Sequence, residues 1–346
     1  MLYVGLDLSR KRVDFHALGA EGELVDRGAV PADGDGLARL VHRLGGCDRE
    51  VLAVIESMNG ARFVHDQLEL AGFEVEIADA QRVKGLAPLA CKTDRIDAWV
   101  LAELARRDLV PAIWLPDPSV RAERERARFR LHLVRQRTRL KNRIHATLIA
   151  HGHARPVSDL FGVKGRALLT RLDLPEPWRG TLAASLRLID VLEVEIAGCE
   201  RELRRLGADH RYLPLLITCP GIAWVLGYTI ASELGEIGRF ASPRKLTGYT
   251  GLCPKVEQSG ERDRRGPLTK NGPRYLRWAL IEAAQHASNS VPYRGLSARK
   301  RAQYPGPRGA KVANICVARK LAEAIWYMLT RNQPFAPAGA TPPLAA

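Results

Sequence analysis

Four carboxylates stand where they could bind a metal ion. Asp7 lies near the end of the mostly apolar run Leu2–Ser9, and Glu56 directly follows a second apolar run. Asp94 and Asp97 are three residues apart at the start of a helical pattern, so they share one face of its first turn. Carboxylate oxygens suit Mg²⁺ or Mn²⁺, and two such ions can align and polarise a phosphodiester.

The Asp94–Asp97 pair alone has a simpler explanation. Acidic residues in a first helical turn are favoured by the helix dipole, and Thr93 is a good N-cap. Asp7 and Glu56 change the balance, because their strands could be neighbours in one sheet. Carboxylates that converge at a sheet edge repel each other unless cations bridge them. We therefore predict a site for Mg²⁺ (or Mn²⁺) made of Asp7, Glu56, Asp94 and Asp97.

A second candidate is Ser259, which precedes a glycine in a segment crowded with cations. Positive charge nearby would stabilise both a serine alkoxide and a pentavalent phosphate. Ser259 is thus a possible nucleophile in a loop, and a turn serine whose neighbours contact phosphate is the alternative. The neighbouring residues that we expect to bind nucleic acid are Arg262, Arg264, Arg265, Lys270, Arg274 and Arg277.

Residues 1–108 alternate strand and helix patterns. We expect strands over 2–9, 13–18, 23–30, 51–55 and 73–78, with helices over 37–44, 61–70, 81–86 and 99–106. Such an order predicts a mixed α/β sheet with helices on its faces. Its opening, a strand with Asp7 followed by a turn and a strand, suits the ribonuclease-H-like fold. Sugar-kinase and actin-like ATPases begin in the same way.

Residues 109–210 predict a proline-rich linker followed by a basic helical arm. The helical patterns cover 120–150 and 183–206, which we expect to pair as an antiparallel coiled coil. The arm could serve dimerisation only, but ten Lys or Arg against two Glu between Arg121 and Arg143 favour phosphate tracking, for example on structured RNA. The expected contacts are Arg121, Arg124, Arg128, Arg135, Arg139, Lys141 and Arg143.

Residues 211–331 predict a mostly α domain. Pro220-Gly221 joins two short helical patterns, which is typical of a helix-hairpin-helix that offers backbone N–H groups to phosphate, and also of an ordinary helix break. Further helices are expected from Arg274 and over 310–329. The Pro/Ala-rich residues 332–346 are expected to be disordered.

The charge is distributed unevenly along the chain. The net charge is +15, yet residues 1–108 hold 14 Lys and Arg against 19 Asp and Glu, and the rest hold 39 against 19. An acidic head on a basic body indicates a polyanionic partner. The six cysteines form no CxxC pair, so neither a zinc site nor a disulfide framework is indicated, and a reducing cytoplasm is expected. The sequence has no signal peptide and no apolar run that could span a bilayer.

Taken together, the motifs resemble those of the DEDD transposases of bacterial insertion sequences, of the insertion-sequence one-ten type. The likeness covers nearly the whole chain, and it is the order and spacing of the motifs that is specific. One departure is that Pro267 and Pro273 flank Lys270. The motifs are found at residues 4–9, 55–57, 92–98, 220–222, 240, 248–254, 258–260, 268–272 and 275–277.

This resemblance implies a RuvC-like head, a helical arm and a transposase domain. It implies that Asp7, Glu56, Asp94 and Asp97 bind metal and that Ser259 forms a covalent phosphoserine link to DNA. It also implies a homo-oligomer, a dimer or tetramer, in which head and tail of different protomers compose one active site. A structured RNA from the element would pair with donor and target DNA, in the bacterial cytoplasm at the nucleoid.

Two other functions stay open. The chain could be a metal-dependent junction-resolving nuclease in which Ser259 only contacts phosphate, or a non-enzymatic nucleic-acid scaffold. A sugar-kinase-like ATPase is least favoured, because no second Asp-Gly phosphate loop follows in the expected order.

Overall fold

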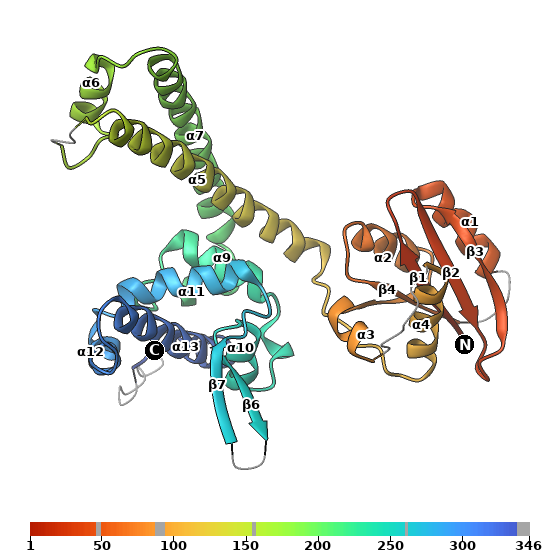
Figure 1. Cartoon of the computed structure of the whole chain (residues 1–346). Coiled ribbons are helices and arrows are strands. Elements are labelled where there is room, and N and C mark those ends of the chain that lie inside the picture. Colours follow the sequence, from red (N-terminus) through yellow and green to blue (C-terminus); the bar gives the residue numbers. More distant parts are fainter. Residues whose placement is uncertain (46–49, 87–93, 154–156, 260–261, 338–346) are drawn as a thin grey trace. The chain divides into compact units, whose positions relative to one another are not determined.

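A computed structural model describes residues 1–45, 50–86, 94–153, 157–259 and 262–337 (Figure 1). The chain forms two compact units, Met1–Leu115 and Pro116–Ala346. Each unit builds its own hydrophobic core. None of the helices in the described ranges is both long and apolar enough to cross a membrane.

The first unit is built on a five-stranded mixed sheet with the order β3-β2-β1-β4-β5. The antiparallel pairs are β1–β2 and β2–β3, and the parallel pairs are β1–β4 and β4–β5. The predicted mixed sheet is therefore confirmed. Its strands are β1 (Leu2–Leu8), β2 (Arg12–Leu18), β3 (Leu24–Pro31), β4 (Val51–Glu56) and β5 (Glu74–Ala78).

Helices cover both faces of this sheet. Alternation along β1 sends Val4 and Leu6 into a core shared with α1 (Gly34–Gly45) and α2 (Ala61–Leu70). The other face carries Tyr3 and Val54, which pack against α3 (Ala80–Leu86) and α4 (Asp94–Arg106). Buried apolar residues on both faces explain why the central strands read as continuous apolar runs.

The segment predicted as a linker begins by bonding to the sheet edge. The Ile113 N–H donates to the Ile77 carbonyl at 2.8 Å, and the Asp79 N–H donates to the Pro111 carbonyl at 3.0 Å. These bonds satisfy backbone groups at the free edge of β5, which the sequence pattern does not reveal. The first compact unit consequently extends to Leu115.

The second unit opens with the predicted helical arm. Helix α5 (Pro118–Ala150) packs along α7 (Trp178–Gly207), with α6 (Val163–Arg171) at the far end of the pair (Figure 1). Ion pairs join Arg126 to Glu202 and Lys141 to Glu193. Residues further along α5 therefore contact residues nearer the start of α7, so the two helices are antiparallel.

The rest of the second unit is mostly α, as predicted. Its core is formed mainly by α9, α11 and α13. Gly221 follows the short α8 with φ +81°, and a Cβ there would lie 2.2 Å from the Ala283 carbonyl, so this turn packs directly on α11. The helices are α8 (Leu213–Leu216), α9 (Trp224–Leu234), α10 (Pro243–Tyr249), α11 (Arg274–Ala287), α12 (Val291–Ala302) and α13 (Pro307–Arg331), with a 3₁₀ turn at Ile237–Arg239.

Two features of this unit differ from expectation. The segment treated as a loop around Ser259 is an antiparallel hairpin of β6 (Pro254–Ser259) and β7 (Arg262–Leu268). Its strands are exposed and mostly polar, so they lack the alternation that marks a half-buried strand. In the tail that was expected to be disordered, the Phe335 N–H donates to the Thr218 hydroxyl at 2.9 Å and its ring packs near Tyr293. Residues 338–346 lie outside the described part.

Candidate functional site

Asp7 and Glu56 stand side by side at the carboxyl ends of neighbouring parallel strands. Leu6 of β1 pairs with Ile55 of β4, so the next residue of each strand lies at the same level. Leu6 and Ile55 belong to the core on the α1–α2 face, and alternation therefore places Asp7 and Glu56 on the α4 face. Both residues are partly buried. The tertiary structure thus brings together two predicted site residues that are far apart in the sequence.

Gly5 sets the close approach of α4 to this face. A Cβ at Gly5 would lie 1.9 Å from the Ala98 carbonyl oxygen and 2.5 Å from the Ala102 nitrogen. Only glycine therefore lets the helix backbone rest directly on β1. Asp97, which is partly buried, immediately precedes Ala98.

The direction of α4 decides which end of the sheet receives its first turn. Near the other end of the helix, Arg106 donates to the Ala20 carbonyl at 3.4 Å, beside the turn that follows β2. That turn lies where β1 begins, so α4 runs antiparallel to β1. Its first turn, with Asp94 and Asp97, lies at the end of β1 that carries Asp7. The side chain of Asp94, like the predicted cap Thr93, lies outside the described residues.

Asp14 is a further carboxylate of this site that the sequence interpretation missed. It is the Cα partner of Asp7 across the β1–β2 pair, so both side chains lie on the same face of the sheet. Asp14 is buried, and Arg12 holds it with a 2.7 Å bond from Nε and a second contact from Nη2. The sequence analysis could have found this neighbour only by predicting which residues of the first two strands pair.

The chemistry of these donors fits a hard divalent cation. Asp7, Glu56 and Asp97 offer carboxylate oxygens, with no thiolate or imidazole among the predicted ligands, which favours Mg²⁺ or Mn²⁺ over zinc. The described side chains do not include that of Asp94. Among them, no group of three His, Cys, Asp or Glu could hold a metal ion.

Ser259 ends β6 at the tip of the hairpin. Its Cα partner is Arg262, and Glu257 pairs with Arg264 two positions further from the tip. Ser259, Arg262 and Arg264 are all exposed, so the hydroxyl is open to an incoming substrate and has cations beside it.

At the base of the hairpin, Arg277 has a structural role. It donates to the Lys270 carbonyl at 3.1 Å and to the Thr250 carbonyl at 3.3 Å, and burial lowers its pKa. These bonds tie α11 to the chain that follows β7. Lys270 itself is exposed, with φ +55°. Contact of Arg277 with nucleic acid stays a prediction.

Two arginines of the arm that we predicted to contact nucleic acid bind another helix of the fold. Arg128 donates to the buried carboxylate of Glu233 at 2.7 and 3.0 Å, and Arg124 donates to the Ser232 and Glu233 carbonyls. Glu233 on α9 is fully buried and needs a counter-charge, which α5 supplies. Arg121 is partly buried and Lys141 lies near Glu193, whereas the exposed members of the set are Arg135, Arg139, Arg143, Arg262, Arg264, Arg265, Lys270 and Arg274.

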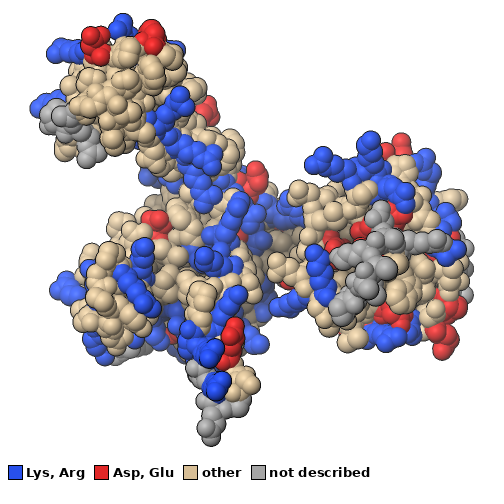
Figure 2. Space-filling view, viewed as in Figure 1, with Lys and Arg blue, Asp and Glu red and all other residues tan. Residues whose placement is uncertain are grey.

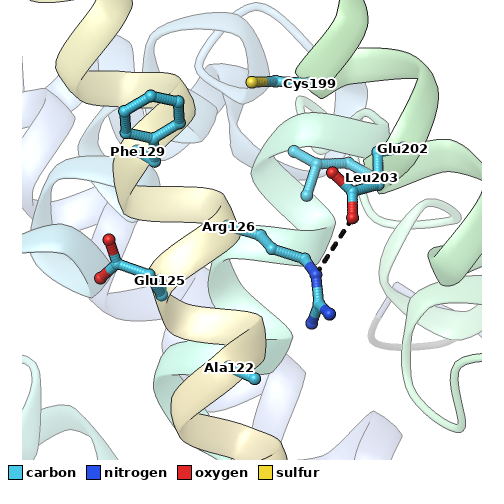
Figure 3. Close-up of a pocket in the computed structure, with 7 residues that line it drawn as sticks. All are labelled: Ala122, Glu125, Arg126, Phe129, Cys199, Glu202 and Leu203. Atoms are coloured by element: carbon cyan, nitrogen blue, oxygen red, sulfur yellow. Dashed lines mark hydrogen bonds and ion pairs between the residues drawn. The ribbon is translucent and has the colours of Figure 1, made fainter.

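A pocket of about 330 Å³ lies between α5 and α7 (Figure 3). Phe129 and Cys199 line one part of it, and Arg126 reaches across to Glu202 at 3.2 Å. Because none of its lining residues belongs to the carboxylate group or to the hairpin, we assign it no part in the chemistry.

Comparison with known proteins agrees with this architecture. Residues 4–151 match the family model of the DEDD transposases of IS110 type, and residues 213–300 match the family described as "Transposase IS116/IS110/IS902 family". A transposase for the insertion sequence element IS1328 of Yersinia enterocolitica is 27% identical over 347 residues, covering 96% of this chain and 98% of the relative. A putative transposase, y4qE, of Sinorhizobium fredii is 26% identical, covering 94% and 87%. The transposase for IS1111A of Coxiella burnetii is 25% identical, covering 82% and 78%.

The mixed sheet with its carboxylates and the two family matches define a DNA transposase of the DEDD class. The chain belongs to the IS110-type family of insertion-sequence transposases. The DEDD domain indicates that its activity depends on a divalent metal ion.

Proposed function

We propose that the chain cuts and rejoins DNA with a metal-binding tetrad and a serine nucleophile. The tetrad is Asp7, Glu56, Asp94 and Asp97, the ion is Mg²⁺ or Mn²⁺, and the nucleophile is Ser259. The observation that carries the proposal is the shared register of Asp7 and Glu56 on the sheet face beneath the first turn of α4.

The strand order also supports a ribonuclease-H-like, RuvC-like fold for the first unit. Three antiparallel strands, β3-β2-β1, continue into two parallel strands, β4 and β5. The first metal-binding Asp of that fold stands on the first, central strand, which is the place of Asp7.

In the proposed reaction the Ser259 oxygen attacks a phosphorus of the DNA backbone. A serine–phosphate ester forms, the bond to one deoxyribose oxygen breaks, and that oxygen gains the proton that the serine loses. Joining reverses the step with a hydroxyl of a new strand. The bound metal would polarise the phosphate, while Arg262 and Arg264 at the hairpin tip would balance its charge.

We further propose the partners that the family resemblance implies. The protein would act as a homo-oligomer in which the tetrad of one protomer works with Ser259 of another. A structured RNA from the element would pair with donor and target DNA. The exposed cations of the second unit support a polyanionic partner of this kind (Figure 2).

A recombination assay in cells, with the element's own ends and flanking DNA, tests this function. We expect both Ser259→Ala and Asp7→Asn to abolish joining. In parallel, denaturing gels should trap a covalent protein–DNA adduct with the wild type and none with Ser259→Ala. If Ser259→Ala still joins DNA while Asp7→Asn does not, the serine has no covalent role. The metal-dependent nuclease is then the better account.

Metal binding can be measured without DNA. Titration calorimetry with Mn²⁺ should show a heat of binding for the wild type that the double variant Asp7→Asn/Glu56→Gln lacks. Circular dichroism of both proteins controls for folding. Binding that survives both substitutions would contradict the proposed tetrad.

A further inference from the structure

The structure sorts the cations of α5 by the surface that each faces. One group lies along α7 and is paired with its carboxylates: Arg126 with Glu202 at 3.2 Å, Arg130 with Glu200 at 3.1 Å, and Arg137 and Lys141 with Glu193 at 4.0 and 3.5 Å. A second group is bound to α9: Arg124 donates to the carbonyls of Ser232 and Glu233, and Arg128 donates to the Glu233 carboxylate. The cations of both groups therefore already have partners within the fold.

The arginines of a third group have no carboxylate partner among the described residues. Arg135, Arg139 and Arg143 are exposed, and within the described residues no carboxylate lies in ion-pair distance of them. They are four residues apart, so they follow one face of α5 with about 6 Å of rise between neighbours. Three guanidinium groups in a row repel each other unless an anion lies along them.

Tyr275, the second residue of α11, ties the beginning of this row to a cation from another helix. The Arg135 guanidinium lies 5.5 Å from the centre of the Tyr275 ring, and that of Arg274 lies at 4.9 Å. Arg274 also donates to the Tyr275 hydroxyl at 3.0 Å. The ring is itself held by Arg128, at 4.9 Å, which the buried Glu233 fixes. Helices α5, α9 and α11 therefore share one anchored network.

We propose that Arg274, Arg135, Arg139 and Arg143 form a cation row that binds the backbone of duplex DNA, and that Tyr275 is the positioning residue of its first two members. Guanidinium forks match phosphate oxygens, and a straight helix presents them to a regular backbone without reading bases. Figure 2 shows Lys and Arg side chains along the arm and where it joins the rest of the second unit. The proposal rests on the chain's handling of DNA and is independent of the roles of Asp7 and Ser259.

The test compares two triple variants of the full chain that remove equal charge from the same helix. The row variant is Arg135→Gln/Arg139→Gln/Arg143→Gln, and the seam variant is Arg126→Gln/Arg130→Gln/Arg137→Gln. Fluorescence anisotropy with a duplex DNA element end, without divalent ions, gives affinity against salt concentration. We expect the row variant to lose on the order of a hundredfold in affinity at about 0.15 M salt, and its salt slope to fall by about 3. The seam variant should keep the wild-type slope.

Tyr275 is tested separately. Tyr275→Ala should weaken DNA binding, and Tyr275→Phe should restore most of it because the ring is kept. Equal losses in the row and seam variants would mean a general charge effect and would overturn the proposal. So would a row variant that binds DNA normally but loses binding of the element's transcribed RNA. The binding assay contains no divalent ion and measures no joining, so failure of the serine proposal is seen only in the recombination assay.

Discussion

At the residue scale, single positions decide whether the carboxylates can meet. Asp7 and Glu56 owe their proximity to strand register, but Asp97 depends on how closely α4 lies on β1. That distance is set by the missing side chain at Gly5, where a Cβ would lie 1.9 Å from the Ala98 carbonyl. Asp14 adds negative charge beside Asp7, and its bond with Arg12 offsets that charge.

Gly5→Ala should push α4 away from the sheet. We expect a loss of about 1–3 kcal/mol in unfolding free energy, as for other overpacked cores, together with loss of Mn²⁺ binding. Calorimetry of unfolding and of metal binding would measure both. Gly34→Ala is the matched control, because a Cβ there meets nothing within 4 Å at the start of α1. A Gly5→Ala protein as stable and as metal-competent as this control would contradict the role of the close packing.

At the element scale, buried and clustered ion pairs fix how helices attach. The carboxylate of Glu233 is fully buried on α9 and joins it to α5 through Arg128. In the first unit, Arg106 and Arg107 at the end of α4 both donate to Glu103. The first pair joins two helices, whereas the second cluster lies within the last turn of α4 and the residue after it, and stabilises the end of that helix.

Glu233→Gln should loosen the attachment of α5. Because it leaves the Arg128 guanidinium without its buried counter-charge, we expect a cost of about 3–5 kcal/mol in the stability of the second unit. Urea unfolding followed by tryptophan fluorescence measures it. Glu323→Gln removes one partner of the exposed Lys320–Glu323 pair and should cost less than about 1 kcal/mol. Similar costs for the two variants would show that burial of Glu233 matters little.

Glu103 gives α4 a pH dependence. The hydrogen bond from Arg106, aided by Arg107, lowers the pKa of Glu103 to about 2 from an ordinary 4.5. A carboxyl with a lowered pKa contributes stability above its unfolded pKa, and this contribution disappears as pH falls from about 4.5 toward 2. Glu103→Gln should therefore cost roughly 1–2 kcal/mol at pH 7, allowing for the partly exposed arginines, and almost nothing at pH 2. Urea unfolding at several pH values would reveal a pH-independent difference if the ion pair is irrelevant.

At the scale of the whole molecule, the chain divides its work between two units. The first carries the carboxylates on an acidic unit, and the second carries the serine hairpin and the exposed cations. The proposed reaction needs both, and the family resemblance implies that they come from different protomers of one assembly.

Mixing two inactive proteins tests this sharing. Asp7→Asn keeps Ser259, and Ser259→Ala keeps the tetrad, so an assembly with shared sites contains some with both parts intact. We expect each protein alone to be inactive in the recombination assay and a mixture to recover part of the wild-type joining. A mixture as inactive as either protein alone would place the tetrad and the serine of each site in one chain.

The sequence by itself determined the strands of the first unit, the long helices of the arm and the class of chemistry. Apolar runs predicted the strands of the first unit, and the helical spacing of apolar residues over 120–150 predicted α5, because these signals are local. The order of the motifs indicated a DEDD transposase. Only the tertiary structure decided which charges are available. Asp14 became a neighbour of Asp7 through strand pairing, and Arg124 and Arg128 were bound by Ser232 and Glu233 of α9. The polar strands around Ser259 paired without an apolar face. Pairing between distant residues depends on register and burial, which no local pattern encodes.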